Sequence, residues 1–169
     1  MCGITGTPGT GKSSAADELA LRGYPVVHLA ETVKDYVVGE DRERDTRIID
    51  EDRWAGEFIP VEGFVEGHLA HLLPCDRVVV LRCRPDILLA RLRSRGYREE
   101  KCRENAEAEA LDVCLIETLD IHPPGHILEV DSSGIPASKV ADLIEGFLEG
   151  SIPPSHGGID WSDYLMEAV

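Results

Sequence analysis

The chain has 169 residues, of which 43% are hydrophobic and 29% charged, as in one ordinary globular domain. Its 32 acidic and 17 basic side chains give a net charge of −15, which argues against direct nonspecific binding of nucleic acid because phosphates are repelled. No apolar run approaches the ~20 residues of a membrane span, and no basic signal-peptide region opens the chain. We therefore expect a cytoplasmic protein that binds no membrane. The acidity itself fits solubility, a basic protein partner or a salt-tolerant host.

The five cysteines are scattered along the chain and form no C-x-x-C pair. An odd number at such spacings argues against a disulfide framework and against a zinc site. We expect reduced thiols that are mostly buried as small hydrophobic side chains.

Short β-rich runs alternate with helical patterns along the chain. Strands are predicted at residues 2–5, 25–29, 64–66, 77–82 and 126–130. Helices are predicted at residues 12–22, 50–58, 85–95 and 136–148, with one further long helix carrying a stripe from Cys102 to Glu117. Residues 78–81 are apolar without alternation, which is typical of a strand buried on both faces. The alternation predicts an α/β fold with a doubly wound, five-stranded parallel sheet.

The composition changes after Gly150. Residues 151–158 are rich in Pro, Gly and Ser, and residues 159–169 are acidic with Trp161 and Tyr164. Residues 1–150 are thus expected to form the domain and residues 151–169 a C-terminal tail. A tail that docks through its aromatic rings is favoured over a disordered end.

Residues 6–13 read Gly-Thr-Pro-Gly-Thr-Gly-Lys-Ser and match the G-x-x-x-x-G-K-[ST] pattern in full. Glycines such as Gly9 and Gly11 let successive backbone N–H groups point into one concavity, capped by a helix N-terminus. A predicted strand before the motif and a predicted helix after it favour a phosphate-binding loop over a glycine turn without phosphate. The segment therefore predicts a P-loop NTPase that binds ATP or GTP.

The residues that follow the glycines predict the chemistry of this loop. Lys12 is expected to reach the β- and γ-phosphates, Ser14 the α-phosphate, and the Ser13 hydroxyl is expected to ligate Mg²⁺. Such a site needs an acid at the end of a neighbouring strand, and Glu66 is the best candidate because Gly67 ends its strand at the carboxyl edge of the sheet. The alternative for Glu66 is a solvated carboxylate at a strand end.

His68 and a group of arginines complete the predicted catalytic set. His68 follows the same strand and is expected to orient a water or a phosphate oxygen, the alternative being an exposed or capping histidine. Arg95 lies beside the glycine hinge at residue 96, where an arginine is able to fold over a nucleotide and neutralise the transferring phosphoryl group. Arg91, one turn earlier, and Lys101 are the second and third candidates.

These motifs together resemble the adenylate kinase 6-type family, the small archaeal and eukaryotic nucleotide kinases linked to ribosome assembly. The resemblance covers residues 2–149 and is carried by residues 6–13, Ile49-Asp50-Glu51-Asp52-Arg53, Val65-Glu66-Gly67-His68, and Arg95-Gly96-Tyr97 followed by Lys101, Asn105 and Glu109. The segments at residues 49–53 and 95–109 are much more specific than the P-loop.

The resemblance implies an ATP-dependent nucleoside monophosphate kinase, with AMP as the usual acceptor, that also hydrolyses ATP slowly. It implies a monophosphate-binding segment at residues 28–49, a short lid at residues 94–104, and a contact of the loop at Ser133, Gly134 and Ile135 with adenine. It further implies binding of a basic small-subunit ribosomal protein of the uS11 type and a role in late maturation of small-subunit rRNA.

The chain departs from the family pattern at three positions. Glu66 stands where the family has aspartate, and His28 and Glu31 stand where relatives often show Asn and Asp. The candidates for the acceptor phosphate are Arg42, Arg44 and Arg47. Two functions therefore stay open, a broad-specificity monophosphate kinase and an assembly ATPase that binds a basic ribosomal protein; a kinase of another small substrate shares only the P-loop.

Overall fold

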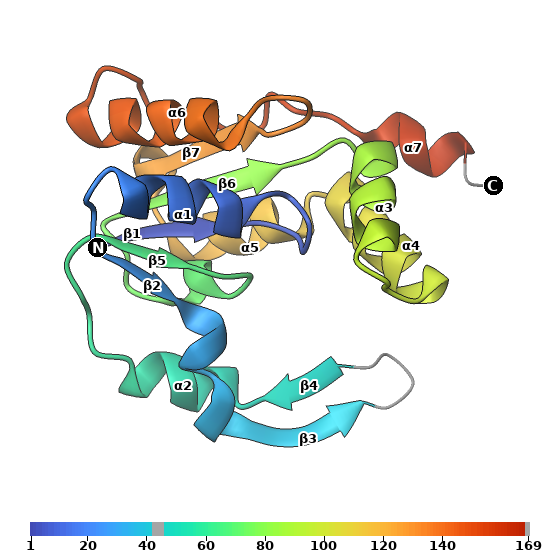
Figure 1. Cartoon of the computed structure of the whole chain (residues 1–169), viewed down its shortest axis with the longest axis horizontal. Helices are drawn as coiled ribbons and strands as arrows, with labels where there is room; N and C mark the ends of the chain where they lie inside the picture. Colours follow the sequence, from blue (N-terminus) through green and yellow to red (C-terminus); the bar gives the residue numbers. More distant parts are fainter. Residues whose placement is uncertain (42–45, 168–169) are drawn as a thin grey trace.

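The computed structural model describes residues 1–41 and 46–167. Five strands form a parallel sheet in the order β2-β5-β1-β6-β7 (Figure 1). They are β1 (Cys2–Thr5), β2 (Val26–His28), β5 (Phe64–Glu66), β6 (Arg77–Arg82) and β7 (Ile127–Asp131). The five predicted strands and the parallel sheet are confirmed.

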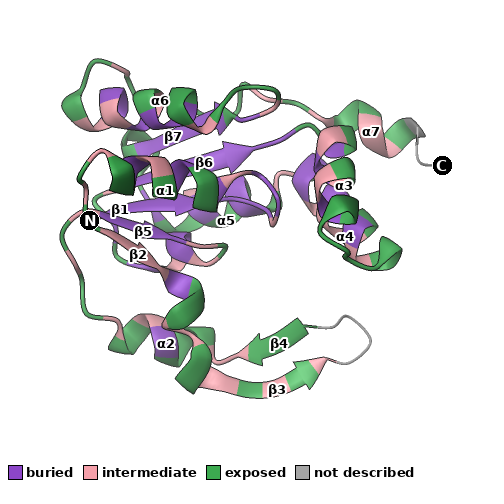
Figure 2. Ribbon diagram, in the orientation of Figure 1, coloured by how far each residue is buried: buried purple, intermediate pink, exposed green. Residues whose placement is uncertain are grey.

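Helices cover both faces of this sheet, because each face carries apolar side chains that must be buried. The helices are α1 (Lys12–Leu21), α2 (Glu51–Glu57), α3 (Pro85–Ser94), α4 (Glu99–Ala110), α5 (Val113–Ile121), α6 (Ala137–Glu149) and α7 (Ser162–Glu167). Single 3₁₀ turns lie at Leu29–Glu31, Lys34–Tyr36, Ala70–Leu72 and Pro124–His126. Figure 2 shows that the inner strands β5, β1 and β6 are almost entirely buried, as the apolar run at residues 78–81 predicts for a central strand.

Two core clusters lie on opposite faces of the sheet. Leu19 of α1 and Phe147 of α6 pack with Ile4 on one face. Trp54 of α2 and Leu115 of α5 pack with the strands on the other. Each fully buried side chain of this size contributes about 2 kcal/mol to folding, so the sheet is a rigid base for its carboxyl edge.

The predicted long helix from Cys102 to Glu117 is wrong, because the chain breaks into α4 and α5. Asp112 adopts a left-handed backbone with φ 57°, which ends the helical hydrogen bonding between the two segments. Its carboxylate pairs with Arg82 of the sheet. This pairing stabilises a conformation that the local sequence does not favour.

The segment at residues 28–49 contains an antiparallel hairpin that the sequence analysis does not predict. Its strands are β3 (Val37–Asp41) and β4 (Thr46–Ile49), and Asp41 pairs with Thr46. Val38 is 65% exposed and Ile48 is 50% exposed, so the hairpin buries little of its apolar surface (Figure 2). Arg42 and Arg44, two of the candidates for the acceptor phosphate, lie outside the described residues.

The tail after Gly150 packs along the edge of the sheet. Ser155 exchanges backbone hydrogen bonds with β7, donating to the Ile127 carbonyl at 3.1 Å and accepting from the Glu129 N–H at 2.7 Å. The short helix α7 then lies against α4 (Figure 1). The tail thus extends from the outer strand to the helices beyond the carboxyl edge.

All five cysteines are free and buried, as expected. Burial raises the pKa of the Cys2 thiol to about 12 and that of Cys114 to about 11, which keeps these thiols protonated and unreactive. Within residues 1–41 and 46–167, no helix has the length and apolar character to cross a membrane.

His71 is a buried histidine whose protonation is expected to make the stability of the folded protein depend on pH. His71 is 1% exposed, with Nδ1 at 2.9 Å from the Thr5 hydroxyl and Nε2 at 3.1 Å from the Glu117 carboxylate. Burial, aided by the nearby His122, lowers the pKa of His71 to about 4, because the half-exposed Glu117 does not offset the cost of a buried imidazolium.

We expect this group to destabilise the protein in acid. The pKa is about 6.5 in the unfolded chain and about 4 in the folded protein, so the stabilisation is complete above pH 6.5 and is lost as the pH falls toward 4. The difference corresponds to about 3 kcal/mol. Urea unfolding at pH 7 and pH 4.5 should show a smaller acid loss of unfolding free energy in His71→Gln than in wild type. An equal loss in both proteins contradicts the assignment.

Candidate active site

The loop between β1 and α1 has a backbone that only glycine permits at its first position. Gly6, Gly9 and Gly11 have φ values of 139°, 94° and 95°. A Cβ on Gly6 would lie 2.3 Å from the carbonyl oxygen of Leu81, so a side chain there would displace the neighbouring strand. The loop leads directly into the N-terminus of α1, which carries no acidic residue in its first turn and is open to an anion.

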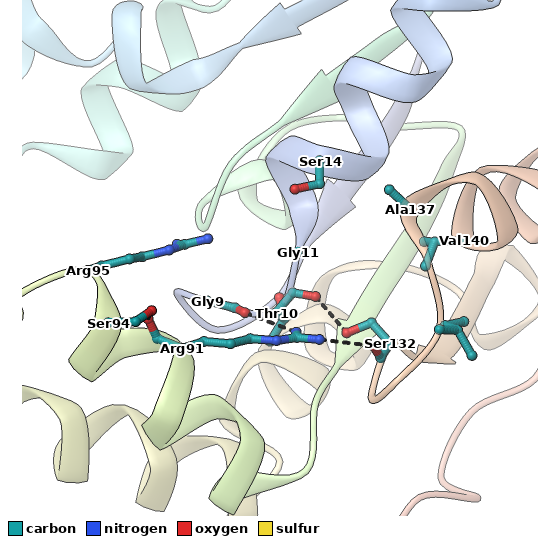
Figure 3. A pocket seen from close by; sticks show the side chains of 11 residues that line it. Gly9, Thr10, Gly11, Ser14, Arg91, Ser94, Arg95, Ser132, Ala137 and Val140 are labelled. Atoms are coloured by element: carbon teal, nitrogen blue, oxygen red, sulfur yellow. Dashed lines mark hydrogen bonds between the residues drawn. The ribbon is translucent and has the colours of Figure 1, made fainter.

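Side chains from two other elements hold this loop from outside. The Ser132 hydroxyl, after β7, donates to the Thr10 carbonyl at 2.6 Å. Arg91 of α3 donates to the Gly9 carbonyl at 3.3 Å and to the Ser132 carbonyl at 3.3 Å (Figure 3). The Thr10 hydroxyl donates to the Thr7 carbonyl at 2.9 Å. The loop is therefore preorganised rather than free to collapse.

Lys12 lies across this loop. Its ammonium donates to the carbonyls of Gly6 and Thr7, each at 2.9 Å, and the residue is 7% exposed. Burial lowers the pKa of Lys12 to about 8, a cost that the carboxylates of Glu66 and Glu109 only partly offset. A phosphate bound in the loop would place negative charge next to this ammonium and stabilise its charged form.

Ser13 and Glu66 face each other at the carboxyl edge of the sheet. The Ser13 hydroxyl donates to Glu66 Oε1 at 3.2 Å, and Glu66 Oε2 lies 2.8 Å from His28 Nδ1. Glu66 is 6% exposed, so its carboxylate is fixed rather than solvated. A hydroxyl and a carboxylate are hard oxygen donors, and a magnesium ion held by few protein ligands together with phosphate oxygens fits this pair.

His68 lies on the other side of the loop. Its Nδ1 is 3.1 Å from the Gly6 carbonyl, and the residue lines a pocket of about 150 Å³ together with Lys12, Ser13 and Arg95. His68 is exposed toward solvent on one side, but desolvation of its ring against the loop and, to a lesser degree, the Lys12 ammonium lower its pKa. A neutral imidazole is therefore available beside the loop at neutral pH.

A second pocket of about 380 Å³ adjoins the loop. Its walls come from the loop, from α3, and from the start of α6 with the segment before it, as Figure 3 shows. Arg91 and Arg95 extend from α3 toward the loop, and Ser14 lies on the side of α1 (Figure 3). Arg95 lines both pockets, as do Gly9, Gly11 and Ser14, so the two pockets are adjoining parts of one site around the loop.

Most predicted site residues thus meet around one loop. The residues brought together are Gly9, Gly11, Lys12, Ser13, Ser14, Glu66, His68, Arg91 and Arg95. Gly134 forms a turn with φ 74° next to the larger pocket, which its neighbours Ser132 and Ile135 line. The ammonium of Lys101, the third cationic candidate, lies 5.3 Å from the centre of the Tyr97 ring.

Two of the side chains that hold the loop cannot be recognised from the sequence motifs. Ser132 is one of these, and Glu109 is another, since it accepts a hydrogen bond from the Thr7 hydroxyl at 2.5 Å. Glu109 lies in the motif after Arg95, but nothing in its spacing indicates a contact with residue 7. Such contacts depend on the tertiary arrangement.

Comparison with known proteins gives one consistent result. The model of a family described as "AAA domain" matches residues 2–112. "Putative adenylate kinase" from Natronomonas pharaonis is 44% identical, over 96% of this chain and 98% of that protein. The protein of the same description from Methanothermobacter thermautotrophicus is 43% identical, over 98% and 99%.

Solved structures with low sequence identity share the fold. Deoxyadenosine kinase from M. mycoides with bound dATP aligns with a TM-score of 0.59 at 16% identity, over 88% of this chain and 98% of that one. A gluconokinase from Sinorhizobium meliloti aligns with a TM-score of 0.53 at 17% identity, over 89% and 97%. Both likenesses support the P-loop α/β architecture.

Proposed function

Because the chain belongs to the same family as the archaeal "Putative adenylate kinase" proteins, we propose that it is an ATP-dependent nucleoside monophosphate kinase, with AMP as the preferred acceptor. The observation that carries this proposal is the preorganised loop, with Lys12 and Ser13 in one pocket, Glu66 hydrogen-bonded to Ser13, and Arg95 lining this pocket and the adjoining one. The smaller pocket, beside Lys12 and Ser13, suits the phosphates of one ATP, and the larger pocket, next to the loop at Gly134, suits its base.

Phosphoryl transfer needs positioning and neutralisation of charge more than a protein nucleophile. The amides of Gly9, Gly11 and Lys12 would bind the phosphate chain, and the Lys12 ammonium would move from the loop carbonyls to the β- and γ-phosphates. When bound, Mg²⁺ would neutralise charge on these phosphates, with Ser13 and Glu66 as its protein donors. Arg95 would close over the transferring group, and Ser14 would contact the α-phosphate.

Two segments are proposed to bind and enclose the acceptor. Figure 1 shows the β3–β4 hairpin and the α3–α4 pair projecting beyond the same end of the sheet, where the strands carry their carboxyl ends. The hairpin belongs to residues 28–49, the proposed monophosphate-binding segment, and carries Arg47 on β4. Residues 94–104 are the proposed lid, and the loop at Gly134 the proposed adenine contact.

Turnover of ATP with each of AMP, CMP, GMP and UMP, and with no acceptor, tests the proposal. We expect ADP formation that depends on a monophosphate and is fastest with AMP. ATP consumption that is the same with and without every monophosphate would contradict a kinase.

A second candidate function, ATP hydrolysis linked to ribosome assembly, is favoured by His68. This neutral imidazole lies beside the loop and the Arg95 pocket, where it is able to orient an attacking water. The net charge of −15 suits a basic partner, which we propose to be a small-subunit ribosomal protein of the uS11 type in late rRNA maturation. Both activities would use one site.

His68→Ala separates the two activities. We expect hydrolysis in the absence of a monophosphate to fall about 10- to 100-fold, because the water loses its orienting group. Transfer to AMP should stay within about threefold, because the acceptor phosphate needs no such help. Rates of ADP formation with and without AMP measure both. Equal loss of the two activities would contradict this role, and a binding assay that detects no basic ribosomal protein at moderate salt would contradict the partner.

A further inference from the structure

Glu109 is a buried carboxylate that contacts the phosphate-binding loop from outside. It lies in the last turn of α4 and is 1% exposed. Oε2 accepts the Thr7 hydroxyl at 2.5 Å, and Oε1 accepts the Arg82 Nε–H at 2.7 Å and the Cys83 backbone N–H at 3.0 Å. One side chain therefore joins the loop to the end of β6.

Arg82 makes this buried carboxylate possible. Its side chain is 1% exposed and pairs with Glu109, with Asp112 and with Glu129 of β7. It also donates to the Glu109 carbonyl at 2.9 Å. A buried charge without partners costs several kcal/mol, so these contacts fix the position of Glu109 and of the end of α4.

Thr7 is the residue through which a change in this contact would reach the rest of the loop. The Thr7 carbonyl accepts hydrogen bonds from the Lys12 ammonium and from the Thr10 hydroxyl. If Thr7 shifts, its carbonyl shifts with it, and the hydrogen bonds from the Lys12 ammonium and from the Thr10 hydroxyl are disturbed together. The hydrogen bond from the Thr7 hydroxyl to Glu109 is the side-chain contact that joins this residue to α4.

We propose that Glu109 is a positioning residue that holds the loop in its phosphate-binding form through the Thr7 hydroxyl, and that Arg82 supports it. The inference rests on the proposed function, since it concerns binding of ATP by this loop. It also joins the loop to α4, the helix that begins within the proposed lid. A displacement of α4 would be felt at Thr7 without any contact between the lid and ATP.

Thr7→Val tests the contact with little change in shape, and Thr7→Ser restores the hydroxyl. We expect Thr7→Val to raise the Kd for MgATP about tenfold, because it removes one hydrogen bond to a charged group. Thr7→Ser should stay within about twofold of wild type. Isothermal calorimetry measures these constants, and steady-state kinetics should place the loss in KM for ATP rather than in kcat.

Glu109→Ala and Glu129→Ala form a matched pair, because each removes one carboxylate from Arg82 but only Glu109 contacts the loop. Both should lower the melting temperature, whereas Glu109→Ala alone should weaken MgATP binding. The double variant Thr7→Val/Glu109→Ala should bind no more weakly than Glu109→Ala, since both changes remove one contact. Equal effects of the matched pair on the Kd, or an unchanged Kd in Thr7→Val, would overturn the inference. If Glu109→Ala does not fold, the two Thr7 variants decide. Failure of the wild-type protein to bind MgATP would instead refute the proposed function.

Discussion

Lys12→Ala is expected to lower phosphoryl transfer from ATP to AMP on the order of 10³-fold. The ammonium is the cation that we place on the β- and γ-phosphates from within the loop itself, and it is already held there by the Gly6 and Thr7 carbonyls. In a partly buried site, loss of one such charge costs about 3–4 kcal/mol of transition-state stabilisation. A coupled assay of ADP formation measures the loss.

Lys139→Ala is the matched control for this variant. Lys139 is an exposed lysine on α6 that pairs with Asp142, and it is not among the residues that we place on ATP. It should keep wild-type activity. Transfer that persists in Lys12→Ala at a rate near that of the control would refute the role of the loop lysine.

Arg95→Ala is expected to lower kcat about 100-fold while the Kd for MgATP changes no more than about threefold. Arg95 lines both pockets and is exposed directly after α3, so its guanidinium is able to reach a phosphoryl group held at the loop. An interaction made mainly in the transition state lowers kcat rather than ground-state binding. Steady-state kinetics and calorimetry together separate the two effects.

Arg95→Lys and Arg84→Ala sharpen this test. A lysine keeps the charge but not the planar fork of donors, so Arg95→Lys should recover only part of the rate. Arg84 is an exposed arginine that pairs with Asp86, and Arg84→Ala should leave kcat unchanged. A loss in Arg95→Ala confined to ATP binding would show that Arg95 binds the donor and does not assist transfer.

The sequence predicts the elements that are buried on both faces and does so for a physical reason. The unbroken apolar run at residues 78–81 favours a strand buried on both faces. The glycine motif is typical of a loop that follows a strand and precedes a helix. The β3–β4 hairpin escapes prediction because its strands are short and only partly buried, and their apolar residues stand side by side instead of alternating with polar ones. The break at Asp112 escapes for a different reason, since the helical stripe from Cys102 to Glu117 continues across a turn that Arg82 of β6 stabilises.

The residues of the candidate site also differ in how far the sequence predicts them. Lys12, Ser13 and the glycines are predictable because their chemistry is local to one motif, and Glu66 because strand ends meet at one edge. His28, which contacts Glu66 at 2.8 Å, stands out in the sequence only as a departure from the family pattern. Glu109 and Ser132 are far from the loop along the chain, so their contacts emerge only once the sheet has been assembled.

The strand order constrains when this protein is able to fold during its own synthesis. β1 is made first, yet both of its neighbours, β5 and β6, lie more than sixty residues downstream, and β2 pairs only with β5. Because translation adds about 5–20 residues per second, several seconds pass between synthesis of the glycine motif and synthesis of the strands that flank β1. A fragment that stops before residue 64 contains β1 and β2 without any of their partner strands, so translational arrest there would leave apolar strands for chaperones to shield.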